Sequence, residues 1–455
     1  MSNIALVIRG KVVLPHLIID KGHVAIGEDG TVAAVGAGDG PPAAEVADYG
    51  DCLVLPGAID GQVHSRRQAG QEDFVWSTRS AAAGGVTTIV DMPYDDGNLI
   101  STGAKLATKA REAAEQARVD FALYGTLHPT SNGSEVRDLL AEGAAAFKFS
   151  TFGTHPERFP RIPPQTLHRF FAAIAPTGLT AGVHNEDDEC VRAAIAEVEA
   201  SGVTDYRAHS RSRPALSEAL AIAQIYEIGA ATGCPAHVVH CSIGRGYELS
   251  DAYRRQGFDA TIEACIHYLV LSEEDDVSRL AGFAKINPPI RPRAEREALW
   301  RHLAAGNITI VSTDHVSWSR DRKSDPHMLK NASGAPGLEP LYALLLRGLE
   351  QHGLPFTYAA RLLAQNPARH FRLYRKGALD IGRDADVAVM RRAPHVYAAA
   401  ASGHNFVDWS AYDGLTLPWR TEATFVRGKR AFEAGQILAA PGSGRFTTPA
   451  SRAKA

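Results

Sequence analysis

The residues best suited to chemistry in this sequence lie at the ends of short apolar runs: His64, Lys148, His184, His240 and Asp314. Imidazole and carboxylate are the usual protein ligands of catalytic zinc, manganese or iron. One such residue alone is more often structural, because a histidine can be hydrogen bonded, a lysine can extend along the surface and an aspartate can cap a helix. Five of them, each at the end of a different predicted strand, indicate a metal centre.

These residues need a fold that brings the ends of separate strands together. The apolar runs that carry them cover residues 53–63, 144–149, 179–183, 236–239 and 308–313. Longer helical segments lie between such runs, and the alternation continues from about residue 51 to residue 371. Repeated strand–helix units predict an α/β protein whose parallel strands close into a TIM (β/α)₈ barrel. In such barrels, chemistry gathers where the strands end and the loops begin.

The two ends of the chain differ from its middle in their pattern of predicted secondary structure. Short β-rich runs broken by glycine and by Asp-Gly turns occur in residues 1–54 and again in 376–440. We expect these two segments to form together one small β-sandwich domain, with the barrel spanning residues 55–375 between them. Residues 441–455 are expected to form a loose tail.

The composition is that of a soluble globular protein. The 455 residues are 45% hydrophobic and 22% charged, and the formal net charge is −3. This small charge gives no electrostatic reason to expect nucleic acid or an anionic membrane as a partner. No apolar run approaches the roughly 20 residues that span a bilayer, and residues 1–10 lack the features of a signal peptide. The five scattered cysteines are expected to be reduced thiols in a cytoplasmic protein.

Several segments resemble the amidohydrolase superfamily. The run LPGAIDGQVHSRRQAGQEDF, residues 55–74, is similar to the family pattern P-G-x-I-D-x-H-x-H-x-R-x-P-G. Further similar segments follow in the family's order: AAAGGVTTIVDMPY, FKFS, VHNED, VVHCS, INPPIR, STDH, SGAPGLEP and GRDADVAV. The resemblance runs from about residue 10 to residue 435. Within the superfamily it points to the cyclic amidohydrolases: dihydroorotase, allantoinase and dihydropyrimidinase or hydantoinase.

The resemblance implies a role for each candidate ligand. Lys148 would react with CO₂ to become N6-carboxylysine, a two-oxygen anion that bridges two metals. His184 and His240 would bind the second metal, and His64 and Asp314 the first. The expected cofactor is Zn²⁺, one or two per subunit, with Mn²⁺ or another divalent metal as the alternative.

The implied reaction is hydrolysis of a cyclic amide or ureide bond in a hydantoin, dihydropyrimidine or allantoin-like ring. Such a carbonyl is a poor electrophile, so a metal must polarise it and bring the pKa of bound water toward neutrality. Metal-bound hydroxide would attack the carbonyl. Asp314 would act as general base and then as general acid, carrying the proton to the leaving nitrogen.

Gln62 departs from the family pattern, because it occupies the place of the first histidine of the H-x-H pair. An amide oxygen is a weaker zinc ligand than imidazole. The first metal could therefore be bound loosely, with or without Gln62, or the enzyme could use the single metal held by Lys148, His184 and His240. A third hypothesis is a non-catalytic, dihydroorotase-like assembly protein.

The predicted substrate-binding residues do not identify which cyclic amide is the substrate. By resemblance, Arg66 and Asn287 orient the substrate, and dihydroorotase itself is an alternative activity. Tyr94 and Trp318 replace an asparagine and a histidine that contact a substrate carboxylate in dihydroorotases. This exchange favours a less charged, flatter or bulkier ring, unless both aromatic rings simply pack against loops. The expected partner is a small cyclic amide, and the family implies a homodimer or homotetramer.

Replacing the proton carrier gives a first prediction. The variant Asp314→Asn is expected to lose turnover but to retain most of its metal, because the amide keeps an oxygen ligand and cannot carry the proton. Initial rates with a cyclic amide and elemental analysis of the same preparation measure the two effects. Turnover close to that of the wild type would refute the role of Asp314.

Overall fold

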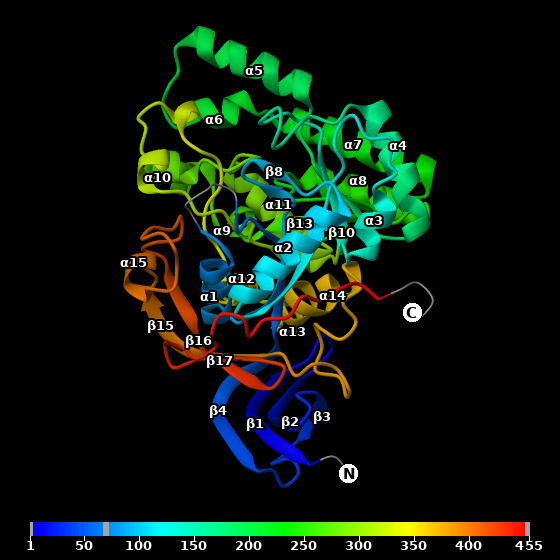
Figure 1. Ribbon diagram of the computed structural model, residues 1–455. Helices are drawn as coiled ribbons and strands as arrows, with labels where there is room; N and C mark the ends of the chain where they lie inside the picture. Colours follow the sequence, from blue (N-terminus) through cyan, green and yellow to red (C-terminus); the bar gives the residue numbers. More distant parts are fainter. Residues whose placement is uncertain (1–2, 67–71, 451–455) are drawn as a thin grey trace.

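The computed structural model describes residues 3–66 and 72–450, which form a barrel and a smaller β domain (Figure 1). Within these residues, eight parallel strands are hydrogen bonded in the order β14-β13-β12-β11-β10-β9-β6-β5. Their bounds are β5 Ala58–Val63, β6 Val86–Asp91, β9 Asp120–Gly125, β10 Ala146–Ser150, β11 Ala181–His184, β12 Ala236–Val238, β13 Ala260–Cys265 and β14 Ile310–Ser312. The predicted barrel is confirmed.

Contacts between the first and last strands close the barrel. Val63, at the end of β5, forms a parallel bridge with His315, which follows β14. The backbone N–H of His64 donates to the carbonyl of His315 at 3.0 Å. Asp60 adds a side-chain link, because its carboxylate accepts the backbone N–H of Thr313 at 3.2 Å and also the Thr313 hydroxyl. No open sheet edge is left between β5 and the segment after β14 in the described chain.

Helices surround the strands and cover the outer face of the barrel wall, while side chains of the strands fill its interior, so the strands are buried on both faces. The barrel-side helices are α1 Phe74–Ala83, α2 Gly103–Gln116, α3 Val136–Ala141, α4 Pro164–Ile174, α5 Asp188–Ser201, α6 Arg207–Ser212, α7 Ala215–Thr232, α8 Gly244–Arg255, α9 Ile266–Val270, α10 Ser278–Leu280, α11 Arg293–Ala304, α12 Leu341–Gln351, α13 Thr357–Ala360 and α14 Asn366–His370. The side chains of Asp73, Thr102 and Asp187 cap α1, α2 and α5. Among the described residues, no helix has the length and apolar character needed to cross a bilayer.

The two ends of the chain meet in the small β domain, as predicted. Its sheet has the order β18-β17-β16-β15-β4-β1-β2-β3. The bounds are β1 Ile4–Val13, β2 Ile18–Gly27, β3 Val32–Ala37, β4 Glu45–Pro56, β15 Val387–Val396, β16 Thr416–Val426, β17 Lys429–Glu433 and β18 Gln436–Ile437. Antiparallel pairing of β4 with β15 joins the two halves, which lie side by side below the barrel in Figure 1. Apolar side chains such as Ile8, Val54 and Phe425 pack into one core.

The segment predicted as a loose tail is held against the barrel in its described part, residues 441–450. Phe446 bridges to Phe121 of β9, and the two rings stack with centroids 5.5 Å apart. The backbone N–H of Arg445 donates to Asp120 at 2.8 Å. Packing against Phe121 partly buries the apolar ring of Phe446, which favours the docked position.

A buried lysine joins the barrel to the β domain. Lys376 Nζ lies 2.9 Å from carboxylate oxygens of both Asp384 and Asp386, and it also pairs with Asp120 on β9. Arg427, which follows β16, contacts the second oxygen of Asp120. Lys376 is 1% exposed, so its three carboxylate partners have little access to water.

We predict that Lys376→Met strongly destabilises the protein, because it removes a cation shared by three buried carboxylates: Asp120 and Asp384 keep an arginine partner, but Asp386 loses its ion pair. Breaking a buried ion pair in this way costs about 3–5 kcal/mol of unfolding free energy. Thermal and urea unfolding followed by circular dichroism measure the loss. Arg245→Ala, which breaks the exposed pair with Glu248, is the control and should unfold like the wild type. Equal stability of the two variants would contradict the prediction.

Candidate metal centre and active site

The predicted ligands converge at the carboxyl ends of the barrel strands. Lys148 lies on β10 and His184 ends β11, while His64, His240 and Asp314 follow β5, β12 and β14 within two residues. They line one pocket with seven other residues: Gln62, Thr154, Phe159, Asn287, Val316, Ser333 and Gly334. The five candidate ligands thus come from the ends of five of the eight barrel strands, β5, β10, β11, β12 and β14.

His184 and His240 form the first pair of the centre. His184 Nδ1 lies 2.9 Å from His240 Nε2. Burial lowers the pKa of His184 below its usual value and that of His240 far below it, so both imidazoles are neutral at pH 7. Neutral imidazole is the form that binds metals. Two ring nitrogens that face one another at this distance are suitable ligands for one ion.

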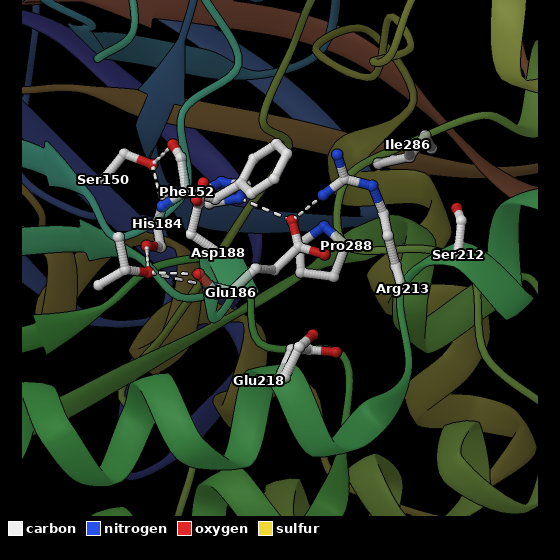
Figure 2. Close-up of polar contacts among 12 residues, drawn as sticks. Ser150, Phe152, His184, Glu186, Asp188, Ser212, Arg213, Glu218, Ile286 and Pro288 are labelled. Carbon is white, nitrogen blue, oxygen red and sulfur yellow. Dashed lines mark hydrogen bonds and ion pairs between the residues drawn. The ribbon is translucent and has the colours of Figure 1, made fainter. Parts of the chain in front are cut away.

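Glu186 and Arg213 fix the ring of His184 (Figure 2). His184 Nε2 lies 2.8 Å from Glu186 Oε2, and Arg213 Nη1 donates to the same oxygen. Burial alone would raise the pKa of Glu186, but Arg213 and His184 lower it to about 2. Because an ionised carboxylate can only accept, Nε2 of His184 carries the proton and Nδ1 keeps its lone pair.

His64 and Asp314 form the second pair. His64 Nε2 lies 3.3 Å from Asp314 Oδ1. Burial would raise the pKa of Asp314, but the hydrogen bond and charge of His64 hold it well below its usual range. Asp314 and His240 both have positive φ angles, 49° and 42°, a strained conformation for a residue with a side chain. Such strain is common at active sites, where surrounding bonds hold the ligand in place.

Lys148 is buried between these groups. Burial lowers its pKa to about 8. Its Nζ donates to Gln62 Oε1 at 3.4 Å, and its charge lowers the pKa values of His184, His240 and Asp314. In the described chain, no three histidine, cysteine, aspartate or glutamate side chains gather as a metal cluster on their own. A metal centre here therefore depends on Lys148 to join the two pairs.

The predicted substrate-binding residues have different positions. Asn287 lines the pocket, and its buried Oδ1 has no hydrogen-bond partner among the described residues. Arg66 instead donates to Glu112 at 2.5 Å and lies over the ring of Phe74, and it is not among the described residues that line the pocket. Trp318 is buried and donates from Nε1 to the carbonyl of Ser333 at 2.9 Å. It supports the pocket wall from behind.

Tyr94 also supports the pocket indirectly. Its hydroxyl donates to the backbone carbonyl of Lys148 at 3.0 Å, and its ring packs edge-on against Phe159 with centroids 4.4 Å apart. Phe159 lies in the pocket, 5.7 Å from the ring of His184. Tyr94 therefore positions Lys148 and Phe159 from outside the lining.

Sequence reasoning did not identify Phe159, Glu186, Arg213 or Glu263. Phe159 lies in the loop after β10, and no periodic pattern marks a loop residue as part of a pocket. Glu186 stands two residues after His184 in the VHNED segment, and this close spacing was a usable signal. Glu263 lies on β13, faces the barrel interior and is fully buried, which its apolar surroundings in the sequence did not reveal.

A sequence model of the Amidohydrolase family matches residues 53–430. The chain belongs to the amidohydrolase family. An allantoinase from Rubrobacter xylanophilus is 35% identical over 456 residues, covering 99% of this chain and 98% of that protein. An L-hydantoinase from Paenarthrobacter aurescens is 30% identical, covering 92% of this chain and 93% of that protein.

Solved structures agree with this assignment. A structure of an L-hydantoinase (dihydropyrimidinase) from Arthrobacter aurescens superposes with a TM-score of 0.93 and 28% identity, covering 98% of this chain and all of that one. The resemblance to the cyclic amidohydrolases is thus confirmed. Membership of the amidohydrolase family also implies the use of a divalent metal ion.

The bond between Glu186 and His184 gives a prediction for this amidohydrolase. Glu186→Gln is expected to weaken metal binding about 10- to 100-fold, because a neutral amide no longer holds the tautomer and orientation of the ligand. Elemental analysis after dialysis against a graded chelator series measures the change. Asp188→Asn is a matched control, since Asp188 is buried nearby but bonds to Arg192 rather than to a histidine. Equal metal retention in both variants would refute the role of Glu186.

Proposed function

We propose that the protein hydrolyses a ring C–N bond of a neutral cyclic ureide of the hydantoin or allantoin type. The observation that carries this proposal is the composition of the pocket. Three histidines, Lys148 and Asp314 supply the chemistry, and the remaining lining residues are uncharged: Gln62, Thr154, Phe159, Asn287, Val316, Ser333 and Gly334. The relatives named allantoinase and hydantoinase support a ring amide as the substrate.

The residues of the centre fit a pair of divalent ions. His184 Nδ1 and His240 Nε2 would hold one ion, His64 and Asp314 the other, with a carboxylated Lys148 shared between them. Burial lowers the pKa of Lys148 to about 8, so a larger fraction of its amine is neutral at pH 7 than in an exposed lysine, and the neutral amine is the form that this modification requires. Its nitrogen forms a bond to the carbon of CO₂ and releases one proton. When bound, the ions polarise the ring carbonyl and lower the pKa of water.

Asp314 moves the proton. Its carboxylate is ionised at neutral pH and lies beside His64, so it can accept a proton from the attacking water. The oxygen of that water bonds to the ring carbonyl carbon, and the C–N bond of the ring breaks. The same proton then passes from Asp314 to the departing nitrogen, which leaves as part of the opened chain.

The neutral lining favours an uncharged ring over dihydroorotate. Among the described lining residues, Lys148 is the one lysine or arginine, and its role in the centre leaves no cation for a substrate carboxylate. Arg66 is paired with Glu112. Asn287 Oδ1 is available to accept a ring N–H, while Phe159 offers an apolar face to a flat ring. Assembly as a homodimer or homotetramer, and Zn²⁺ or Mn²⁺ as the metal, stay predictions.

Substrate and metal tests check this proposal together. The protein prepared with bicarbonate and Zn²⁺ or Mn²⁺ is expected to open hydantoin, allantoin or dihydrouracil and to lose this activity on chelation. For dihydroorotate we expect a kcat/KM at least about 100-fold lower, because its carboxylate would be buried without a partner. Efficient turnover of dihydroorotate alone would establish the dihydroorotase alternative. Failure to hydrolyse any ring, with no metal bound, would favour the non-catalytic assembly protein.

A further inference from the structure

Gln62 replaces a family histidine, yet its side chain is held in the centre. It is fully buried at the end of β5. Its Nε2 donates to Glu263 Oε1 at 2.5 Å, and its Oε1 accepts from Lys148 Nζ at 3.4 Å. Both ends of the amide are thus bonded inside the barrel.

These two partners fix which way the amide points. A carboxylate can only accept hydrogen bonds and an ammonium can only donate them. The reversed amide would place its oxygen against Glu263 and its N–H₂ against Lys148, so that both bonds would be lost. The oxygen of Gln62 therefore faces the Lys148 side, where the first-metal ligands lie.

Glu263 is itself held firmly. It is fully buried on β13, and its Oε1 also accepts the backbone N–H of His240 at 3.1 Å. His237 Nε2 lies 3.6 Å from its other oxygen. Because the bond to Gln62 does not involve Lys148, it remains in place when Lys148 carries a carboxylate. Glu263 thus orients Gln62 and also links it, through the backbone N–H of His240, to the segment that follows β12.

We propose that Gln62 is an oxygen ligand of the first metal and that Glu263 is the residue that positions it. This proposal rests on the binuclear centre of the proposed function. The first position then has one imidazole, from His64, and oxygen donors from Gln62, Asp314 and the carboxylated Lys148. The second position has two imidazoles, from His184 and His240.

The two positions should therefore differ in metal preference. Imidazole favours zinc, whereas carbonyl and carboxylate oxygens suit harder ions such as Mn²⁺. Zn²⁺ still binds most nitrogen and oxygen sites more tightly than Mn²⁺ does. The consequence is one of degree: the first position discriminates less strongly against Mn²⁺ than it would with a histidine at position 62.

A metal titration tests this asymmetry without using activity. Metal-free protein is loaded with bicarbonate and one equivalent of Zn²⁺ per subunit, then titrated with Mn²⁺ while the EPR signal of free Mn²⁺ is followed. The wild type is expected to bind one Mn²⁺. Glu263→Gln and Gln62→Met are expected to bind it about 10- to 100-fold more weakly, because the oxygen ligand is misdirected or removed.

Two further variants complete the test. In Gln62→His, the Zn²⁺ concentration that displaces half of the Mn²⁺ should fall about 10-fold or more, since imidazole restores zinc preference. Tyr247→Phe is the matched control: Tyr247 bonds to the backbone carbonyl of Glu263 and not to Gln62, so its Mn²⁺ affinity should equal that of the wild type. Thermal unfolding of each variant verifies that it is folded.

The outcomes separate this proposal from the function on which it rests. Wild-type Mn²⁺ affinity in folded Glu263→Gln or Gln62→Met would overturn it, as would unchanged zinc competition in Gln62→His. If either of these results is obtained and the wild-type enzyme still opens a ureide ring, the proposed function is supported and the proposed role of Gln62 is refuted. If the wild type opens no ring and binds no metal, both the proposed function and the proposed role of Gln62 are refuted.

Discussion

Burial of ionisable side chains inside a closed barrel is the constraint on which this structure depends. A carboxylate removed from water is costly unless other groups bond to it. Asp60, Glu186 and Glu263 are all fully buried, and each bonds to a residue on another part of the chain. Asp60 binds Thr313 and Glu263 binds Gln62, so these bonds join β5 to β13 and to the residue that follows β14. The barrel is thereby closed by polar links as well as by backbone pairing.

The same links hold the candidate metal ligands. Glu263 accepts the backbone N–H of His240, and Glu186 holds the imidazole of His184. Lys148 is fixed from behind, because the hydroxyls of Tyr94 and Thr126 both donate to its backbone carbonyl. Burial then determines the protonation states: neutral imidazoles at His184 and His240, and a lowered pKa at Lys148. A set of candidate ligands held in this way would need little rearrangement on binding a metal.

The sequence predicted the barrel and the convergence of the candidate ligands because both follow from local patterns. Apolar runs that end in His184 or His240 mark strand ends, and parallel strands must bring those ends together. Arg66 was predicted in the pocket, but the structure pairs it with Glu112 on α2, a contact between distant segments that no local pattern encodes. Phe159 enters the pocket from a loop, where periodicity gives no guidance. The docking of Phe446 on β9 likewise depends on tertiary packing.

The sheet that unites the two chain ends cannot be completed until the second of its two halves has been synthesised. Strand β4 pairs with β15 through residues Leu53–Pro56 and Val387–Met390, which are separated by about 330 residues. At roughly 5–20 residues per second, a ribosome needs tens of seconds to produce that interval. Until β15 has been made, the edge of β4 that pairs with it has no partner. An unpaired strand edge is a template for pairing with another chain, so this interval is one in which the nascent chain is open to aggregation.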